Sequence, residues 1–511
     1  MFKKVVKNTS ISSLGMSVSL VLGFVRNILV ARFFGTSGIL EAFIVAFRLP
    51  NLFRSIFGEG FSDSVATPVL SEYQHEKLRL FEAGRNLLSF SALVLLLATL
   101  LGVLCAKFLV FIIAPGFLND PAKFNMAVSF TKITFLYLFF IGLSVNSFSI
   151  LYVLKKFFVP SITPAFLNIS FIIGLLFFNN IFENYILVIC VLVGGVLQVI
   201  FPFIALKRQG FSFRFKIKGI FKDEALRKML KLSPPRIISS IIYQLSVILD
   251  TVFASFTQIV GQGALAAIWF ANSYIHLPLA LFIHSICRVA MVDLSYYHSQ
   301  GNLEDFKKLF VFSFQNIVFF IVPISVMYIF LSREIIDVVL KRGDFDIRSL
   351  TITASVLYFY SFGLFFFCGI KLLVNAFYAL KDTLVPAKVT AFSLIVNAVL
   401  SAILMFPLKI GGVALGSSLA AIVNFFILYT ILVKKIGAID WQDTRSQFLK
   451  VFLLSLLVAG TCRFFWDFFT FSKYIKALIV VVSSISIFIT GGYFLRLKQV
   501  YYLKEWISKA R

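Results

Sequence analysis

The chain has 511 residues, of which 59% are hydrophobic, and its mean hydropathy is +0.94. Apolar runs of about twenty residues recur from one end to the other, each long enough to cross a bilayer as a helix, so a soluble globular protein is excluded. The net charge of +25 lies in the loops between these runs, which favours membrane topology over a nucleic-acid partner as its explanation.

The apolar runs predict an all-α polytopic membrane protein with about fourteen transmembrane helices. Runs such as 475–494 do not alternate in polarity, as the strands of a β-barrel would. The N-terminal run continues through Arg26 without a small-residue cleavage site, so we expect a retained first helix and not a signal peptide. In chain order the expected spans are 11–34, 40–61, 88–112, 127–154, 163–179, 185–206, 237–256, 264–294, 309–331, 350–379, 387–407, 411–433, 448–470 and 475–495.

Basic residues alternate between the loops on the two sides of the expected spans. If the N-terminus is cytoplasmic, every second loop should be basic. Loops on that side carry lysine pairs at 155–156, 307–308 and 434–435, whereas loops 35–40 and 179–185 carry neither Lys nor Arg. We therefore predict that both termini face the cytoplasm.

Two connections depart from a simple alternation. The loop 332–349, on the expected outer side, holds four basic residues offset by four acidic ones. The longest cytoplasmic connection, 207–236, is strongly basic. Either a helix around 223–232 lies on anionic headgroups, or positive-inside topology alone accounts for this charge.

The first two expected spans contain charged residues within the expected apolar core of the membrane. Arg26 lies in the first, and the second, EAFIVAFRLPNLFRSIFGEG, holds Arg48, Arg54 and Glu59, with Pro50 in its middle. An arginine at a helix centre costs roughly 2.5–3.5 kcal/mol, so such residues face a polar cavity or a partner instead of lipid. The guanidinium fork matches phosphate oxygens two at a time, which points to an anionic, phosphate-bearing cargo. For Arg48 and Glu59, snorkelling or pairing with loops near the helix ends is the alternative.

The second half of the chain offers more scattered polar candidates. His284 and Arg288 share a helix face at i,i+4 spacing, for which packing against Asp293 or a loop is the favoured interpretation. The sequence contains no phosphate-binding loop of the Walker type and no His-Glu-x-x-His helix, and the cysteines show no paired spacing. We therefore expect no enzymatic activity, no metal site and no cofactor. The other polar candidates in this half are Asp250, His276 and Lys371.

An internal repeat divides the chain. LYVLKKFFVP at 151–160 matches FYALKDTLVP at 377–386 with an offset of 226, and two further landmarks, a proline and a basic-then-glycine ending, recur at nearly the same offset. The repeat predicts two homologous six-helix lobes in the same orientation around a central cavity, an architecture suited to alternating access. The expected organisation is an N-lobe at 1–210, a basic cytoplasmic linker at 211–236, a C-lobe at 237–437, and two further helices with a cytoplasmic C-terminus at 438–511.

The segments 23–27, Gly-Phe-Val-Arg-Asn, and 42–60 carry a resemblance to the MurJ (MviN) family of lipid II flippases. The resemblance runs through most of the chain and implies the fold of the multidrug/oligosaccharidyl-lipid/polysaccharide exporters. It implies that Arg26 and Arg54 line the central cavity and engage the diphosphate of lipid II, and that the last two spans form a groove for its polyprenyl tail. Further motif positions are occupied by Ser19, Glu41 and Glu59.

The chain also departs from the family pattern. Leu20 replaces an arginine, and the motif aspartates become Asn27 and Glu41. In the eighth span the family's Ala-Asp-Arg-x-x-Glu-x-Pro has lost its charges at three positions of this chain, and Lys371 or His276 is expected to compensate in part. Those three positions are Asn272, Ser273 and His276.

The sequence therefore predicts a flippase of the bacterial cytoplasmic membrane that moves undecaprenyl-linked peptidoglycan precursor from the inner to the outer leaflet. Its expected partners are lipid II, membrane lipids and cell-wall synthesis proteins, and the membrane potential is a plausible driving force. Two alternatives are an exporter of another lipid-linked oligosaccharide or amphiphile, and a non-transporting scaffold of the cell-wall machinery.

Overall fold

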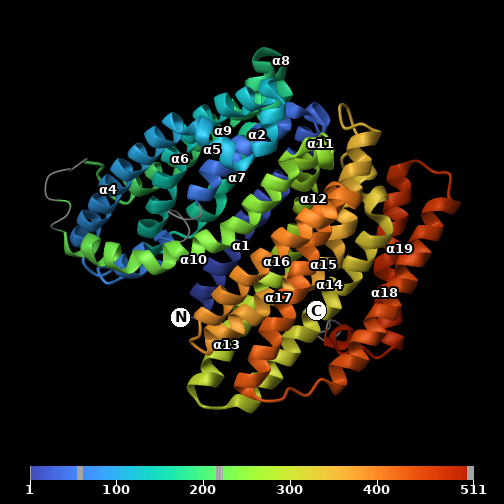
Figure 1. Ribbon diagram of the computed structural model, residues 1–511. Helices are drawn as coiled ribbons and strands as arrows, with labels where there is room; N and C mark the ends of the chain where they lie inside the picture. Colours follow the sequence, from blue (N-terminus) through green and yellow to red (C-terminus); the bar gives the residue numbers. More distant parts are fainter. Residues whose placement is uncertain (1, 55–60, 215–219, 221–222, 503–511) are drawn as a thin grey trace. The chain divides into compact units, whose positions relative to one another are not determined.

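The computed structural model describes residues 2–54, 61–214, 220 and 223–502, and the regular elements within those ranges are helices (Figure 1). A helix satisfies its backbone N–H and C=O groups internally, which an apolar surrounding requires. The predicted all-α polytopic class is confirmed. The α-helices are α1 (Phe2–Phe34), α2 (Gly38–Arg54), α3 (Thr67–Ser71), α4 (Lys77–Leu104), α5 (Ala106–Ile113), α6 (Pro121–Val153), α7 (Phe158–Ile173), α8 (Asn179–Phe182), α9 (Ile186–Arg208), α10 (Glu224–Ser255), α11 (Thr257–Val260), α12 (Ala264–Pro278), α13 (His284–Ser299), α14 (Leu303–Val339), α15 (Ile347–Ala379), α16 (Leu384–Leu408), α17 (Ile410–Ile436), α18 (Gln442–Phe468) and α19 (Lys473–Phe494). Short 3₁₀ or π turns join them at η2 (Ser62–Ala66), η3 (Pro115–Asn119), η4 (Gly174–Phe178), η5 (Glu183–Tyr185) and η7 (Leu279–Ile283).

Eleven segments of the described chain are long and apolar enough to cross a membrane. One of them, 158–208, contains two helices, α7 and α9, which pack side by side and so make two passes. Helix α2 has 17 residues and stops where the described chain is interrupted at 55–60. The count of fourteen spans stays a prediction.

The contacts divide the chain into two compact units, 1–257 and 258–511. In the first unit α6 is the central helix, because α2, α4 and α9 all pack against it. Small residues allow the close approach: a Cβ at Gly142 would lie 2.5 Å from the Leu95 side chain, and one at Gly195 would lie 2.7 Å from the Tyr137 ring.

The second unit repeats this pairing with α15 at its centre. Helices α12, α14 and α17 pack against α15, and α16 packs on α17 as α7 packs on α9. Figure 1 shows α14 to α17 running alongside one another within this unit. The two homologous bundles predicted from the sequence are therefore present, each built around one long central helix.

The repeated segment has the same backbone geometry in both units. Lys155 and Lys381 each follow the central helix with φ of 59°, in the left-handed region. The next N–H then donates back to a helix carbonyl, from Lys156 to Leu151 O at 2.8 Å and from Asp382 to Phe377 O at 2.9 Å. This closure satisfies carbonyls that the helix end would leave without donors.

A fourth landmark at the offset of 226 lies at the start of each central helix. The carboxylate of Asp120 accepts a hydrogen bond from the backbone N–H of Lys123 at 3.1 Å, and that of Asp346 accepts one from Ser349 at 2.7 Å. Aspartate is a preferred N-cap because its oxygen satisfies an N–H of the first turn. The same residue type therefore begins the central helix of each unit.

Helix α10 covers part of the expected linker and the expected seventh span. It is continuous from Glu224 to Ser255 and packs on α3, α4, α5 and η3 of the first unit. Gly116 in η3 lies so close that a Cβ would be 2.2 Å from Ser255 O, and its N–H donates to Ser255 Oγ at 3.0 Å. The expected seventh span therefore belongs, by its contacts, to the unit that ends at residue 257.

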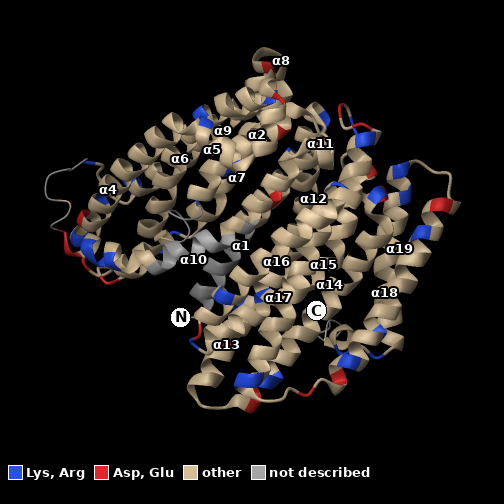
Figure 2. Ribbon diagram, viewed as in Figure 1, with Lys and Arg blue, Asp and Glu red and all other residues tan. Residues whose placement is uncertain are grey.

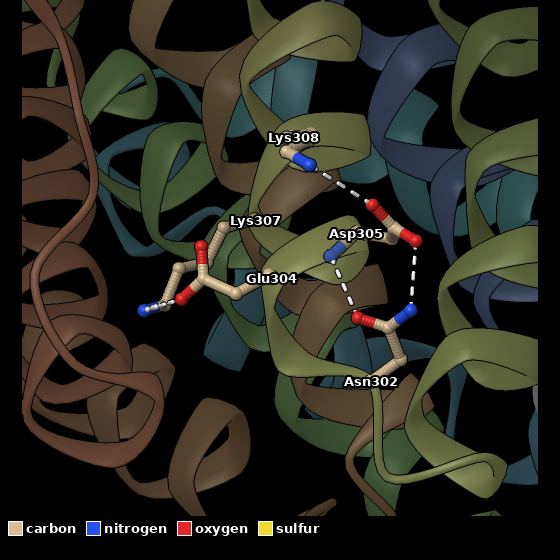
Figure 3. Close-up of polar contacts among 5 residues, drawn as sticks. All are labelled: Asn302, Glu304, Asp305, Lys307 and Lys308. Atoms are coloured by element: carbon tan, nitrogen blue, oxygen red, sulfur yellow. Dashed lines mark hydrogen bonds and ion pairs between the residues drawn. The ribbon is translucent and has the colours of Figure 1, made fainter.

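Charged residues gather mainly toward the ends of the long helices, while their middles are largely uncharged (Figure 2). The start of α14 illustrates the arrangement (Figure 3). Asn302 caps the helix by accepting from the N–H of Asp305 at 3.1 Å, and its own amide donates to the Asp305 carboxylate at 2.7 Å. Lys307 and Lys308 pair with the acidic first turn at i,i+3 spacing, at 3.1 and 3.3 Å.

Candidate functional site

Arg26 lies at the end of a row of aromatic rings in the first unit. Its guanidinium carbon is 5.7 Å from the centre of the Phe171 ring on α7. From Phe171 the rings continue through Phe43 and Phe47 of α2 to Tyr137 of α6, with centre-to-centre distances of 6.0, 5.6 and 5.7 Å. A cation over such a ring gains electrostatic attraction while its N–H groups remain directed by other contacts. Helix α7 thus contacts this guanidinium through Phe171, and the rings of α2 and α6 pack behind Phe171.

The residue next to Arg26 directs the guanidinium. Nε and Nη2 both donate to the amide oxygen of Asn27, at 3.2 and 3.0 Å. An aspartate at this position would contribute a negative charge as well as an acceptor, whereas the amide oxygen is a neutral acceptor. Asn27 therefore orients Arg26 without adding an anion beside it.

Arg48 and Arg54 of α2 have different surroundings. The Nη1 of Arg48 donates to Val247 O at 2.7 Å and to the hydroxyl of Thr251, both on α10. The Nε of Arg54 donates to the side-chain oxygen of Asn51 one turn earlier, at 2.7 Å. Arg48 therefore ties α2 to α10, which is neither the snorkelling nor the loop pairing considered from the sequence.

Glu41 is held inside the first unit. Its side chain is fully buried and forms an ion pair with Lys123, whose own side chain is 8% exposed. The Lys123 ammonium also lies 4.3 Å from the centre of the Phe117 ring. A buried carboxylate requires such a partner, since an isolated charge in this environment is very costly. The structure thus places Glu41 against Lys123, away from any surface open to a ligand.

The remaining N-terminal candidates are less informative. Ser19 is half-buried on α1, and its carbonyl accepts from the side-chain amide of Asn168 at 2.9 Å. This bond helps to hold α1 against α7. Glu59 lies outside the described residues.

In the second unit, α13 and α15 bring basic side chains together. The Nζ of Lys371 lies 2.9 Å from Nδ1 of His284. Arg288 follows His284 by one turn of α13. His284 therefore contacts Lys371, and the packing of His284 and Arg288 against Asp293 or a loop stays a prediction. Ser273 is half-buried, and its hydroxyl donates to Trp269 O at 3.3 Å within its own helix.

Sequence reasoning missed three partners that the structure supplies. Lys123 was not singled out, although a glutamate within an apolar run signals that a buried cation exists elsewhere in the chain. Thr251 and Val247 were missed because nothing in their local pattern marks them as the partners of Arg48. Separations of 82 and 199–203 residues leave no signal in local periodicity.

Comparison with known proteins places this arrangement in a family. The family model described as "Lipid II flippase MurJ" matches residues 30–483. A protein named probable lipid II flippase MurJ from Buchnera aphidicola subsp. Schizaphis graminum is 30% identical over 96% of this chain and 97% of its own length. One from Rickettsia prowazekii is 29% identical over 94% and 95%.

Solved structures share the fold. A lipid II flippase MurJ in an inward closed conformation superposes with a TM-score of 0.79 at 24% identity, covering 95% of this chain and 98% of its own. An inward-facing multidrug transporter of the MATE family superposes with a TM-score of 0.68 at 14% identity, covering 84% and 99%. With the family model spanning most of its length and full-length relatives in agreement, the chain belongs to the MurJ family of lipid II flippases.

Proposed function

We propose that this protein moves lipid II, the undecaprenyl diphosphate-linked muropeptide, from the inner to the outer leaflet of the cytoplasmic membrane by alternating access. It is a transporter and a multi-pass protein of the bacterial inner membrane. The relatives' name supports lipid II over another lipid-linked oligosaccharide or amphiphile, and over a non-transporting scaffold. The observation that carries the proposal is Arg26, a cation within a span whose guanidinium lies against the Phe171 ring of α7.

The proposed transport step requires no covalent bond to break. A diphosphate crossing the membrane must exchange water for protein donors, and guanidinium groups supply paired N–H donors in the geometry of phosphate oxygens. Arg26 and Arg54 fill this role in the proposal, because both lie on helices of the first unit and are only partly buried. Arg48 contributes by fixing α2 against α10.

The driving force in the proposal is the membrane potential. An anionic headgroup that leaves a negative interior gains about 2.3 kcal/mol per charge per 100 mV. With both termini in the cytoplasm, as the loop charges predict, the direction of export follows from this field. The polyprenyl tail would run along the outer faces of α18 and α19, where large apolar side chains are exposed: Leu449, Leu453, Leu457, Leu478 and Ile485.

The test is the amount of lipid II accessible from outside spheroplasts of a host whose own flippase is depleted. This protein should restore accessible lipid II, and the Arg26→Ala/Arg54→Ala variant should not, while the total lipid II pool rises. Arg79→Ala is the control, since Arg79 is an exposed arginine that pairs with Glu76 at i,i+3. Accessibility that does not depend on this protein, at normal expression, would refute the proposal.

A further inference from the structure

The ends of α14 and α18 meet the start of α19 in a charged cluster that the first unit lacks. At the offset of 226, its segment 334–342 corresponds to 108–116, which contains no charged residue. The cluster lies on the side that the loop charges predict to be outer, where positive charge is normally scarce, so topology does not account for it. Its members are the carboxylates of Glu334, Asp337 and Asp467 and the cations Lys341, Arg342, Arg463, Lys473 and Lys476.

Ion pairs explain part of this cluster. Arg463 of α18 pairs with Glu334 of α14. The carboxylate of Asp337 on α14 lies 3.4 Å from Nζ of Lys473, the first residue of α19, and 3.6 Å from Nζ of Lys341. A single carboxylate thus serves two lysines. These contacts join α14 to α18 and α19, which have no counterpart in the first unit of the repeat.

Two further cations contact aromatic rings in place of carboxylates. The guanidinium carbon of Arg342 lies 5.6 Å from the centre of the Tyr474 ring, and Nη2 donates to Val338 O at 3.0 Å. Nζ of Lys476 lies 5.7 Å from the Trp466 ring and donates to Trp466 O at 2.9 Å. Nε of Arg342 has no acceptor, and neither cation forms an ion pair, within the described residues. Hydrogen-bond donors and positive charge therefore remain in excess here.

The Tyr474 ring receives a second cation. Nζ of Lys473 lies 5.6 Å from the centre of the same ring that Arg342 contacts. Two like charges at one ring repel each other, and an anion beside them removes that cost. Tyr474 is 53% exposed and begins an exposed apolar stripe along α19 at helical spacing. The stripe continues through Leu478, Val481 and Ile485.

We propose that Arg342, Lys473 and Lys476, together with Tyr474, bind the phosphate of an anionic phospholipid in the outer leaflet. Tyrosine and tryptophan favour the level of the headgroups, and basic residues at that level attract anionic lipids. The guanidinium and ammonium groups supply donors to the phosphate oxygens. The apolar stripe that starts at Tyr474 offers a surface for an acyl chain of the same molecule.

This site does not depend on the proposed function, because it lies on the lipid-exposed side of α19 and requires no transport. Its occupant is a membrane lipid and not the lipid-linked cargo, since bulk lipid has constant access to the exposed stripe. Snorkelling of the same cations to water is the structural alternative, and it predicts no preference among lipid headgroups.

The test is lipid binding to the purified full-length protein in neutral detergent, followed by native mass spectrometry. Phosphatidylglycerol and phosphatidylcholine with identical acyl chains are the probes. The wild-type protein should prefer phosphatidylglycerol, and the preference should fall with added salt. Arg342→Gln/Lys476→Gln should reduce the preference about tenfold, each single substitution about threefold, and Arg342→Lys little. These variants leave the ion pairs of Asp337 and Arg463 in place.

The control with equal charge loss is Lys388→Gln/Lys434→Gln, whose lysines are exposed near helix ends on the expected cytoplasmic side. A preference that falls equally in this control and in Arg342→Gln/Lys476→Gln would refute the site, as would a wild-type protein that binds both probes alike. Undecaprenyl diphosphate is the third probe. If it alone loses affinity in Arg342→Gln/Lys476→Gln, the site belongs to the cargo and the phospholipid assignment is wrong. Thermal unfolding of each variant excludes misfolding.

Discussion

Helices α6 and α15 occupy the same place in two homologous units, yet they carry opposite electrostatic arrangements. Both begin at a capping aspartate and end in the same left-handed closure. Three residues after its cap, α6 has Lys123, which neutralises the buried Glu41, whereas α15 has Ser349 and pairs no such charge there. Instead α15 presents Lys371 to another basic residue. The repeat therefore preserves backbone geometry and packing, while the ionisable groups of the two central helices differ: α6 holds a buried ion pair and α15 a lysine beside a histidine.

Substitution of Lys123 should have the largest effect on stability and tests the difference between α6 and α15. Lys123→Met leaves Glu41 buried without a cation and should destabilise the first unit by about 3–5 kcal/mol. Glu41→Gln/Lys123→Met, which removes both charges, should recover most of that loss. Thermal unfolding in detergent measures both. Lys371→Met should show no comparable loss, and an equal fall in stability for Lys123→Met and Lys371→Met would contradict the division of roles.

A second prediction concerns the packing of α10 on the first unit. Gly116→Ala places a Cβ 2.2 Å from Ser255 O and should cost roughly 1–3 kcal/mol by pushing α10 away from η3. Protease accessibility of α10 and thermal unfolding provide the measurement. Gly460→Ala in α18 is the control, because nothing lies within 4 Å of its added Cβ. A harmless Gly116→Ala would mean that α10 does not depend on the first unit.

The paired caps should respond alike. Asp120→Ala and Asp346→Ala should each cost about 1 kcal/mol, because each leaves an N–H of the first turn without its acceptor. For Asp346 the hydrogen bond from the Ser349 backbone N–H, followed by that from its side chain, holds the pKa below its usual value.

The lowered pKa of Asp346 determines how the stability of the protein changes with pH. A carboxyl with a lowered pKa in the folded state stabilises the protein above its unfolded pKa, about 3.9, and this contribution is lost as pH falls through the folded value. Asp346→Asn should keep the cap and flatten this part of the acid unfolding profile. A profile for Asp346→Asn identical to that of the wild type would exclude the assignment.

The smallest effect tests the repeat itself. Lys155→Gly and Lys381→Gly should each stabilise their unit by roughly 0.5–1 kcal/mol, because glycine adopts the left-handed conformation without the Cβ penalty but loses more chain entropy on folding. The two shifts in unfolding temperature should agree, since both residues have φ of 59°. Opposite signs would show that the closures are not equivalent.

Much of the fold could be predicted because it depends on local pattern. Apolar runs gave the helical spans, and the match between 151–160 and 377–386 identified the two bundles before their shared closure was seen. Arg26 and Arg54 could be identified as candidates because a charged residue within a membrane span rarely has a purely structural role. The prediction that they engage a diphosphate remains to be tested.

The local sequence pattern could not identify interaction partners that are distant along the chain. The partner of Glu41 is 82 residues away, and that of His284 is 87 residues away, so neither follows from spacing along one helix. The packing of α10 on the first unit could not be predicted for a related reason. The repeat describes ancestry, whereas the position of α10 depends on close contacts such as that of Gly116 with Ser255.

The pair of Glu41 and Lys123 also bears on how the chain enters the membrane. Glu41 leaves the ribosome in the second span, and its cation follows only at the start of α6, after the third span. A charged residue at the centre of a lone helix raises the cost of entering lipid by roughly 2.5–3.5 kcal/mol, and by less near an end. Helix α2 therefore carries a carboxylate without its cation until α6 has been synthesised, and the buried ion pair of the first bundle forms only when its central helix is present.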